Sequence, residues 1–324
     1  MDSTAAAATA ALAACSAALG VAACARRGLS GRGRALVYAD RGAGERSVAS
    51  LVESLVERSF VVREIRAPEV IAGGWEAEAD LFCIPGGADL PYCELLNGRG
   101  NRRIREYVER GGSFLGLCAG GYYGSSRCEF EVGRRLEVCG ERELGFFPGI
   151  ARGAAFDGFL YDEVRPTLSP TPPHPPLPFL TRTPCPQETG TRAALLNIGP
   201  ESHASGEQER ATVYVNGGCG YLSLAGEAAD TVDGCTVLAW FADPEVAERI
   251  GQAGSPTRRG EGHVAAAVRC RVGRGAAVVS GTHPELAPAW LEGSKIDPGV
   301  LRKLKEGDEG RKRFFDLLLN AAGV

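Results

Sequence analysis

The first half of the chain alternates short apolar runs with segments whose apolar residues recur at helical spacing. The runs cover residues 35–39, 60–65, 80–84 and 113–117, and three of them end in a turn that contains glycine. Apolar residues spaced three or four apart between residues 48 and 56, and again from 104 to 108, indicate helices. Strands that alternate with helices favour a parallel sheet. We therefore predict an α/β fold, a mostly parallel sheet with helices on both faces.

The second half returns to strands. Candidate strands cover residues 212–215, 236–241, 265–272 and 276–280, and a hairpin turn is predicted at residues 272–275. Apolar residues between 301 and 318 predict a C-terminal helix that docks on the sheet. We expect residues 34–324 to form a single domain.

Two segments differ from this pattern. Residues 1–33 are rich in Ala and Arg and contain a single acidic residue, Asp2. They are either an organelle transit peptide or a disordered or loosely helical extension, so the expected compartment is cytoplasmic or organellar. Residues 166–186 hold nine of the chain's 19 prolines, which is incompatible with a helix or a central strand. We predict an exposed loop insertion there.

Composition excludes several function classes. The net charge of −4 and the pI of about 5.8 give no general basis for binding nucleic acid. No run of about 20 strongly apolar residues is present, so no membrane partner is expected. The eleven cysteines form no CxxC pair and no Cys/His cluster of zinc type, which argues against a structural zinc protein. We expect free thiols in a reducing compartment, no metal and no cofactor.

The segment Gly116-Leu117-Cys118-Ala119-Gly120-Gly121 follows a predicted strand and is typical of a nucleophile elbow. Glycines two positions before and after Cys118 leave room for a sharp turn, and a helix N-terminus behind it favours a thiolate. The alternative is a buried cysteine in a Gly-rich turn. A thiol nucleophile also needs a base, and the base needs an orienting acceptor.

His283 and Glu285 follow the last predicted strand, two residues apart, and can supply base and acceptor. Gly86 and Gly87 follow the strand at 80–84, where their N–H groups, with that of Ala119, are candidate oxyanion donors. The alternative for these two glycines is a plain turn.

Together these features resemble the class I glutamine amidotransferase superfamily, and within it the N-terminal domain of eukaryotic biotin–protein ligases. The motifs that carry the resemblance are FCIPGGADLPY at 82–92, GLCAGGYYGSSR at 116–127, FFPG at 146–149, YVNGGCGY at 214–221 and GTHPE at 281–285. The resemblance implies a flavodoxin-like three-layer sandwich over residues 34–320. It also implies acyl transfer from an amide, with Cys118 as nucleophile, His283 as base and Glu285 orienting His283.

This chain departs from the superfamily pattern at one informative position. Glutamine amidotransferases usually carry Gln four residues after the nucleophile, where this chain has Tyr122. The expected ligand is therefore a small amide, not necessarily glutamine. Residues that flank the site are weaker candidates for binding it: Asp89, Tyr92, Tyr122, Tyr123 and Arg127.

The sequence also lacks both a synthetase domain and a biotin-ligase catalytic domain, so we expect a stand-alone protein. Whether it is an enzyme is left open. The alternative is a non-catalytic binding or regulatory module whose partner is a biotin ligase, a synthetase subunit or a carboxylase.

Overall fold

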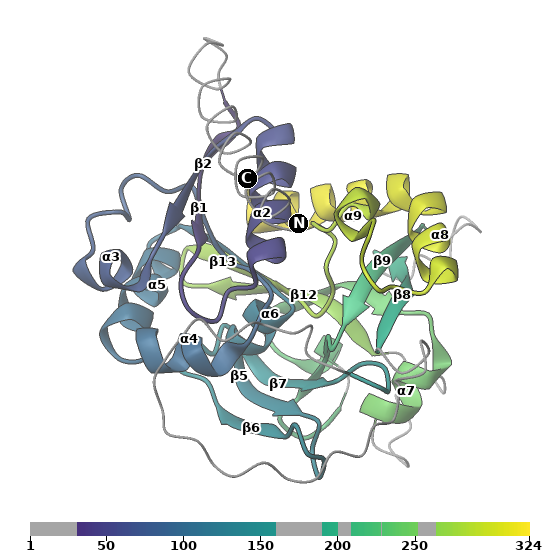
Figure 1. Ribbon diagram of the computed structural model, residues 1–324. Coiled ribbons are helices and arrows are strands. Elements are labelled where there is room, and N and C mark those ends of the chain that lie inside the picture. The colour runs from purple at the N-terminus through teal and green to yellow at the C-terminus, as the bar shows by residue number, and fades with distance from the viewer. Residues whose placement is uncertain (1–30, 160–189, 200–208, 228, 252–263) are drawn as a thin grey trace, which may run out of the picture.

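Five parallel strands form the part of the sheet that carries the predicted motifs. The computed structural model describes residues 31–159, 190–199, 209–227, 229–251 and 264–324 (Figure 1). The parallel strands lie in the order β2-β1-β3-β4-β13, and each predicted run is confirmed as a strand. Their bounds are β1 (Gly33–Tyr38), β2 (Phe60–Ile65), β3 (Leu81–Ile84), β4 (Ser113–Leu117) and β13 (Gly275–Ser280).

The remaining strands extend this sheet, mostly with antiparallel pairing. β12 (Ala265–Val272) pairs with β13 through the predicted hairpin. From β12 the sheet continues through β10 (Gly220–Ser223), β7 (Phe147–Gly153), β5 (Ser125–Phe130) and β6 (Val138–Glu141). A branch leaves β12 through β11 (Cys235–Phe241), β8 (Thr191–Ile198) and β9 (Arg210–Asn216). Of these strands, β5, β6, β7, β8 and β10 were not predicted from the sequence.

Helices cover both faces of the parallel strands, as predicted (Figure 1). On one face lie α2 (Glu45–Glu57) and α9 (Asp308–Ala322), whose Leu51 and Phe314 pack in one core with Ala35 of β1. On the other face, Leu36 of β1 packs with Ile104 of α5. The helices of this second face are α3 (Ala67–Ala72), α4 (Asp89–Leu96), α5 (Arg99–Glu109) and α6 (Ala119–Tyr123). The two cores on either side of the sheet make a three-layer α/β sandwich.

The other helical elements lie in the second half of the chain. They are α7 (Pro244–Ile250), α8 (Pro298–Glu306) and the 3-10 turns η2 (Ala229–Thr231) and η3 (Pro288–Leu291). No helix in the described part of the chain is both long and apolar enough to span a bilayer. The Pro-rich segment 166–186 lies outside the described residues. The predicted extension 1–33 does so up to residue 30, and Gly33 already begins β1.

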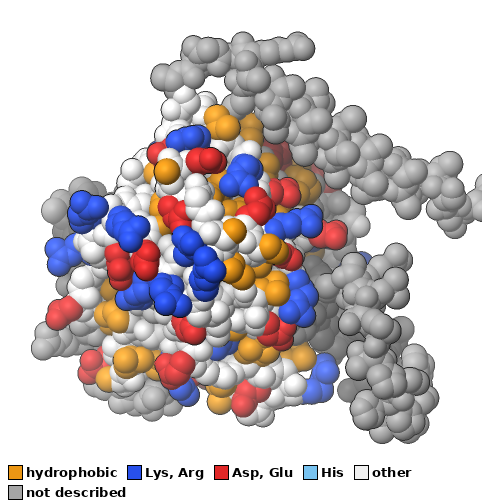
Figure 2. Space-filling model, turned by 90° about the vertical axis from the view of Figure 1, so that its left-hand side faces the viewer, with side chains coloured by type: hydrophobic (Ala, Val, Ile, Leu, Met, Phe, Trp, Pro, Cys, Tyr) orange, Lys and Arg blue, Asp and Glu red, His pale blue; other side chains and the backbone are white. Residues whose placement is uncertain are grey.

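The surface on the α3 and α5 side carries basic and acidic side chains side by side (Figure 2). Several arginines of α5 and its C-terminal end are neutralised locally. Arg105 pairs with Glu109 at 3.1 Å, and Arg103 reaches Glu76 in front of β3 at 3.0 Å. The arginine-rich sequence of α5 therefore builds a surface of mixed charge.

Candidate active site

Cys118 stands at the sharp turn between β4 and α6. Its φ of 49° is in the left-handed region, which side chains other than Gly rarely adopt, and its N–H donates to Ser280 O of β13 at 2.8 Å. The flanking glycines are needed because backbone passes close to them. A Cβ on Gly120 would lie 2.0 Å from Ile84 O, and one on Gly116 would lie 2.4 Å from Gly120 O. The local geometry is that of a nucleophile elbow.

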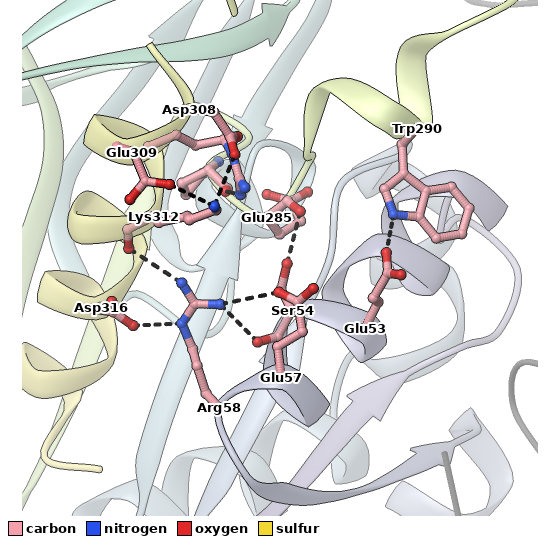
Figure 3. Close-up of polar contacts among 12 residues, drawn as sticks. Glu53, Ser54, Glu57, Arg58, Glu285, Trp290, Asp308, Glu309, Lys312 and Asp316 are labelled. Carbon is pink, nitrogen blue, oxygen red and sulfur yellow. Dashed lines mark hydrogen bonds and ion pairs between the residues drawn. The ribbon is translucent and has the colours of Figure 1, made fainter. Parts of the chain in front are cut away.

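The His-Pro-Glu segment follows β13 and is fixed by three hydrogen bonds, of which Figure 3 shows the one between Ser54 and Glu285. The His283 N–H donates to Tyr214 O of β9 at 3.0 Å. Arg311 of α9 donates to Pro284 O at 2.6 Å, and Ser54 of α2 donates to Glu285 O at 2.9 Å. Elements far apart in sequence thus hold the segment in place.

The structure brings the side chains of Cys118, His283 and Glu285 together. His283 Nδ1 lies 2.8 Å from Glu285 Oε1, and the His283 ring and the Cys118 side chain both stand against Gly86. With Nδ1 donating to the carboxylate, Nε2 is the nitrogen left for the sulfur. Burial would lower the pKa of His283, but the negative charges of Cys118 and Glu285 outweigh it and raise this pKa well above its ordinary value. The raised pKa favours the protonated imidazolium form of His283.

Gly86 lies directly against this pair. A Cβ on Gly86 would stand 2.4 Å from His283 Cε1 and 3.3 Å from Cys118 Cβ, so only glycine leaves room for the ring. Its N–H donates to Ser47 Oγ at 2.9 Å. This geometry does not support the prediction that Gly86 is an oxyanion donor, because its N–H already has a buried acceptor.

In the part of the chain that the structure describes, the N–H groups of Gly87 and Ala119, unlike that of Gly86, are free to bind a ligand. Neither N–H has a hydrogen-bond acceptor among the described residues; Ala119 directly follows Cys118, and Gly87 follows Gly86, which lies against Cys118. Gly87 has a φ of 149°, and a Cβ there would lie 1.9 Å from Gly42 O, so this position also needs glycine. These two amides remain the candidate donors to an oxyanion.

Ser47 of α2 was not predicted, and it links the two halves of the site. Its hydroxyl donates to Glu285 Oε1 at 3.0 Å while accepting the Gly86 N–H. The available signal is a row of small polar residues on the apolar face of α2, where Ser47, Ser50 and Ser54 are all buried.

The β9–β10 turn is a second wall of the site that was not assigned a role from the sequence. Asn216 O lies 3.9 Å from Cys118 Sγ, and Gly217 and Gly218 follow with positive φ. The available signal was a Gly-Gly pair after a strand, the pattern that marked Gly86 and Gly87.

The three tyrosines predicted as weak ligand-binding residues are buried, and their hydroxyls have partners inside the protein. Tyr92 donates to Pro85 O at 3.1 Å, Tyr122 to Gly218 O, and Tyr123 to Asn101 Oδ1. Burial raises the pKa of Tyr122 well above its ordinary value, so its hydroxyl stays a donor. Tyr92 and Tyr122 therefore support the two Gly-Gly turns of the site.

The two charged candidates also have intramolecular partners. The Asp89 carboxylate accepts from Arg142 Nε at 2.8 Å in a largely buried ion pair. Arg127 pairs with Glu129 and Glu141 on the β5–β6 ladder. Their role in ligand binding stays a prediction.

Family comparison identifies the chain. A family model described as the N-terminal part of biotin–protein ligase matches residues 34–166 and 185–324. The chain belongs to this family. The resemblance drawn from the motifs is thereby confirmed for the biotin–protein ligase N-terminal family.

Two curated relatives are similar over part of their length. The chain is 29% identical over 265 residues to a biotin–protein ligase of Schizosaccharomyces pombe, covering 81% of this chain and 34% of the relative. It is 39% identical over 129 residues to an uncharacterized protein of Chlamydia muridarum, covering 38% of this chain and 50% of that protein. The matches thus span about a third and a half of these relatives.

Solved structures with a similar chain trace are remote in sequence. PurLQS from Thermotoga maritima is 13% identical, with a TM-score of 0.46 and coverage of 89% of this chain and 98% of that chain. A ThuA-like protein from Bacteroides uniformis is 13% identical, with a TM-score of 0.44 and 92% coverage of both chains. The α/β assignment itself rests on the strand order and the two-sided helix packing described above.

Proposed function

We propose that this member of the biotin–protein ligase N-terminal family is a cysteine-dependent amide hydrolase or acyl transferase. The observation that carries the proposal is the convergence of Cys118, His283 and Glu285 in one buried site, with 2.8 Å between His283 Nδ1 and Glu285 Oε1. A nucleophile, a base and an orienting carboxylate in this order are what acyl transfer requires.

In the proposed reaction the Cys118 sulfur attacks the carbonyl carbon of an amide. The Gly87 and Ala119 N–H groups stabilise the oxyanion that forms. His283 gives its proton to the leaving nitrogen as the carbon–nitrogen bond breaks, which leaves a thioester on Cys118. His283 then takes a proton from water or another acceptor nucleophile as that nucleophile forms a bond to the thioester carbon. The carbon–sulfur bond breaks, the acyl product is released, and Cys118 and His283 return to their starting state.

Tyr122 is the reason why the proposed substrate is a small carboxamide in general. It occupies the position where glutamine amidotransferases usually have Gln, and its ring is buried with the hydroxyl bonded to Gly218 O. Neither side chain nor hydroxyl is offered to a ligand there. The proposal therefore names a small carboxamide and not glutamine itself.

Alkylation of Cys118 tests the activated thiol directly. Iodoacetamide at neutral pH, followed by mass mapping, should label Cys118 faster than Cys139, although Cys139 is exposed and Cys118 is 7% exposed. Faster labelling of Cys139 would refute the proposal.

Ammonia release from a panel of carboxamides, with Cys118→Ala as the control, then tests the reaction. Turnover that survives in Cys118→Ala would move the chemistry elsewhere.

A second function has its own supporting observation. Similarity to a biotin–protein ligase over 265 residues supports a binding or regulatory module that docks on such a ligase. This function predicts that a biotin–protein ligase from the same cell binds the chain in calorimetric titration. Cys118→Ala should bind equally well if docking is independent of the triad. Absence of any heat of binding would count against the module.

A further inference from the structure

Two cysteines outside the candidate active site face each other across neighbouring strands. Cys235 begins β11 and lies opposite Cys270 of β12 in the antiparallel register. The Arg271 N–H donates to Gly234 O at 3.0 Å, so the hydrogen bond flanks the cysteine pair and does not join it. Pairs of this type are the close ones, with Cα atoms about 4.5 Å apart. That separation is within the range of about 4.4–6.8 Å that disulfides span.

The two sulfurs are already in contact as thiols. Cys235 Sγ lies 3.3 Å from Cys270 Sγ, and both residues are free cysteines. A disulfide between them would join strands that are paired in any case, so its formation requires no rearrangement of the ladder.

The pair is asymmetric. Cys270 is 1% exposed, whereas Cys235 is only partly buried. The contact with the Cys270 sulfur lowers the pKa of Cys235, while the same contact and burial raise the pKa of Cys270 well above its ordinary value. The accessible sulfur is thus also the better nucleophile, with the buried thiol placed to resolve it.

We propose that Cys235 and Cys270 form a two-electron redox site at which hydrogen peroxide oxidises both thiols to an intramolecular disulfide. The Cys235 thiolate attacks one peroxide oxygen, the oxygen–oxygen bond breaks, and Cys235 becomes a sulfenic acid as the other oxygen leaves as water. The Cys270 sulfur then attacks Cys235, forming the sulfur–sulfur bond and releasing the second water. Two thiols and one hydrogen peroxide give one disulfide and two waters.

Another cysteine pair in the sheet shows that this opposition is specific. Cys128 of β5 and Cys139 of β6 lie on paired antiparallel strands, but Cys128 is opposite Gly140 and Cys139 is opposite Glu129. Because neighbouring positions point to opposite faces, the two sulfurs lie on different sides of the sheet. Cys139→Ser is therefore a matched control that removes a β-strand thiol without touching the proposed pair.

The test treats reduced full-length protein with a few equivalents of hydrogen peroxide, blocks free thiols with iodoacetamide and maps the peptides. Cleavage after glutamate separates Cys219 from Cys235 at Glu227 and Cys235 from Cys270 at Glu245 and Glu261. We expect one linked peptide pair, Cys235 with Cys270, in the wild type and in Cys139→Ser. Recovery of both cysteines as alkylated peptides after peroxide treatment would overturn the proposal.

Single variants separate the two steps. Cys270→Ser should stop the reaction at the sulfenic acid, which dimedone traps on Cys235, and Cys235→Ser should abolish both the trap and the link. Cys270→Ala gives a second, apolar replacement at the buried position in case serine destabilises β12. The link should form equally in Cys118→Ala, so its outcome is separate from that of the proposed acyl transfer. Dimedone labelling of Cys235 that does not increase in either Cys270 variant would exclude Cys270 as the resolving thiol.

Discussion

At the residue scale, Ser47 connects the orienting carboxylate to the Pro-Gly-Gly turn. Glu285 is fully buried, and its Oε2 has no hydrogen-bond partner among the described residues. The hydrogen bonds that hold this carboxylate in place are therefore those that Oε1 makes with Ser47 and His283. Ser47→Ala removes one donor to Glu285 and leaves the buried Gly86 N–H without its acceptor. We expect a loss of about 1–3 kcal/mol in the free energy of unfolding and slower alkylation of Cys118.

Ser50→Ala is the matched control for this change. Ser50 lies on the same buried face of α2, but among the described residues its hydroxyl donates to Ser47 O alone, within the helix. Urea unfolding and iodoacetamide kinetics on both variants separate a role in the site from a role in helix packing. Equal alkylation rates in Ser47→Ala and Ser50→Ala would show that Ser47 does not position the triad.

His283 gives the site a pH-dependent contribution to stability. Its pKa is raised in the folded state, so the folded protein binds the proton more tightly than the unfolded chain, where the pKa is about 6.5. This stabilisation is complete below about pH 6.5 and is lost as the pH rises through the folded-state pKa. The advantage of wild type over His283→Gln in free energy of unfolding should therefore shrink as the pH rises above about 6.5.

Urea unfolding across this pH range measures the effect. Glu285→Gln is the control, because it removes one of the two charges that raise the His283 pKa and should flatten the dependence. A wild-type advantage that is constant with pH would mean that folding does not shift the titration of His283.

At the element scale, α2 and α9 hold the His-Pro-Glu segment against the end of the sheet (Figure 3). Arg311 of α9 is 3% exposed and donates to Pro284 O and to Asp308 Oδ1. Arg311→Met should cost about 1.5–3 kcal/mol, since it removes charged hydrogen bonds and leaves the buried carbonyl unpaired. It should also slow Cys118 alkylation, because His283 and Pro284 are adjacent.

Arg313→Met provides the comparison on the same helix. Arg313 is 58% exposed and pairs with Glu209 at 2.8 Å, and an exposed pair contributes about 1 kcal/mol or less. Thermal unfolding and alkylation kinetics should therefore change little. Similar losses in both variants would mean that α9 contributes through general packing and not through the Pro284 contact.

The strands that the sequence predicted are those whose residues are mostly apolar, whereas strands of mixed polarity were missed. Four of the parallel strands, β1, β3, β4 and β13, are largely buried on both faces and are therefore apolar runs, whereas the edge strand β2 exposes Val61, Arg63 and Glu64. β7 was missed because Pro148 and Gly149 argue against a strand, although pairing with β5 and β10 forms one. β5 mixes Arg127 and Glu129 with buried Cys128, and its polar residues obscured a period-two pattern. Tertiary pairing overrides local preference in such strands.

At the scale of the whole molecule, the triad was predictable because each of its residues belongs to a local motif. Cys118 and His283 are 165 residues apart and meet because β4 and β13 are parallel neighbours. Ser47 belongs to no motif, and its contact with Glu285 depends on how α2 lies on the sheet. For the same reason, the Pro-Gly-Gly sequence could not predict that the Gly86 N–H donates to Ser47 Oγ.

The Pro-rich segment provides the last test at this scale. The family model matches residues 34–166 and 185–324 and leaves 167–184 unmatched, so the family fold does not depend on this stretch of sequence. Replacing residues 167–184 with a short Gly/Ser linker should leave Cys118 alkylation unchanged. It should shift the thermal midpoint by less than about 4 °C, since loop closure varies slowly with length. A scrambled segment of equal length and composition separates the effect of length from that of sequence. A fall of more than about 8 °C would show that the segment contributes to the stability of the fold.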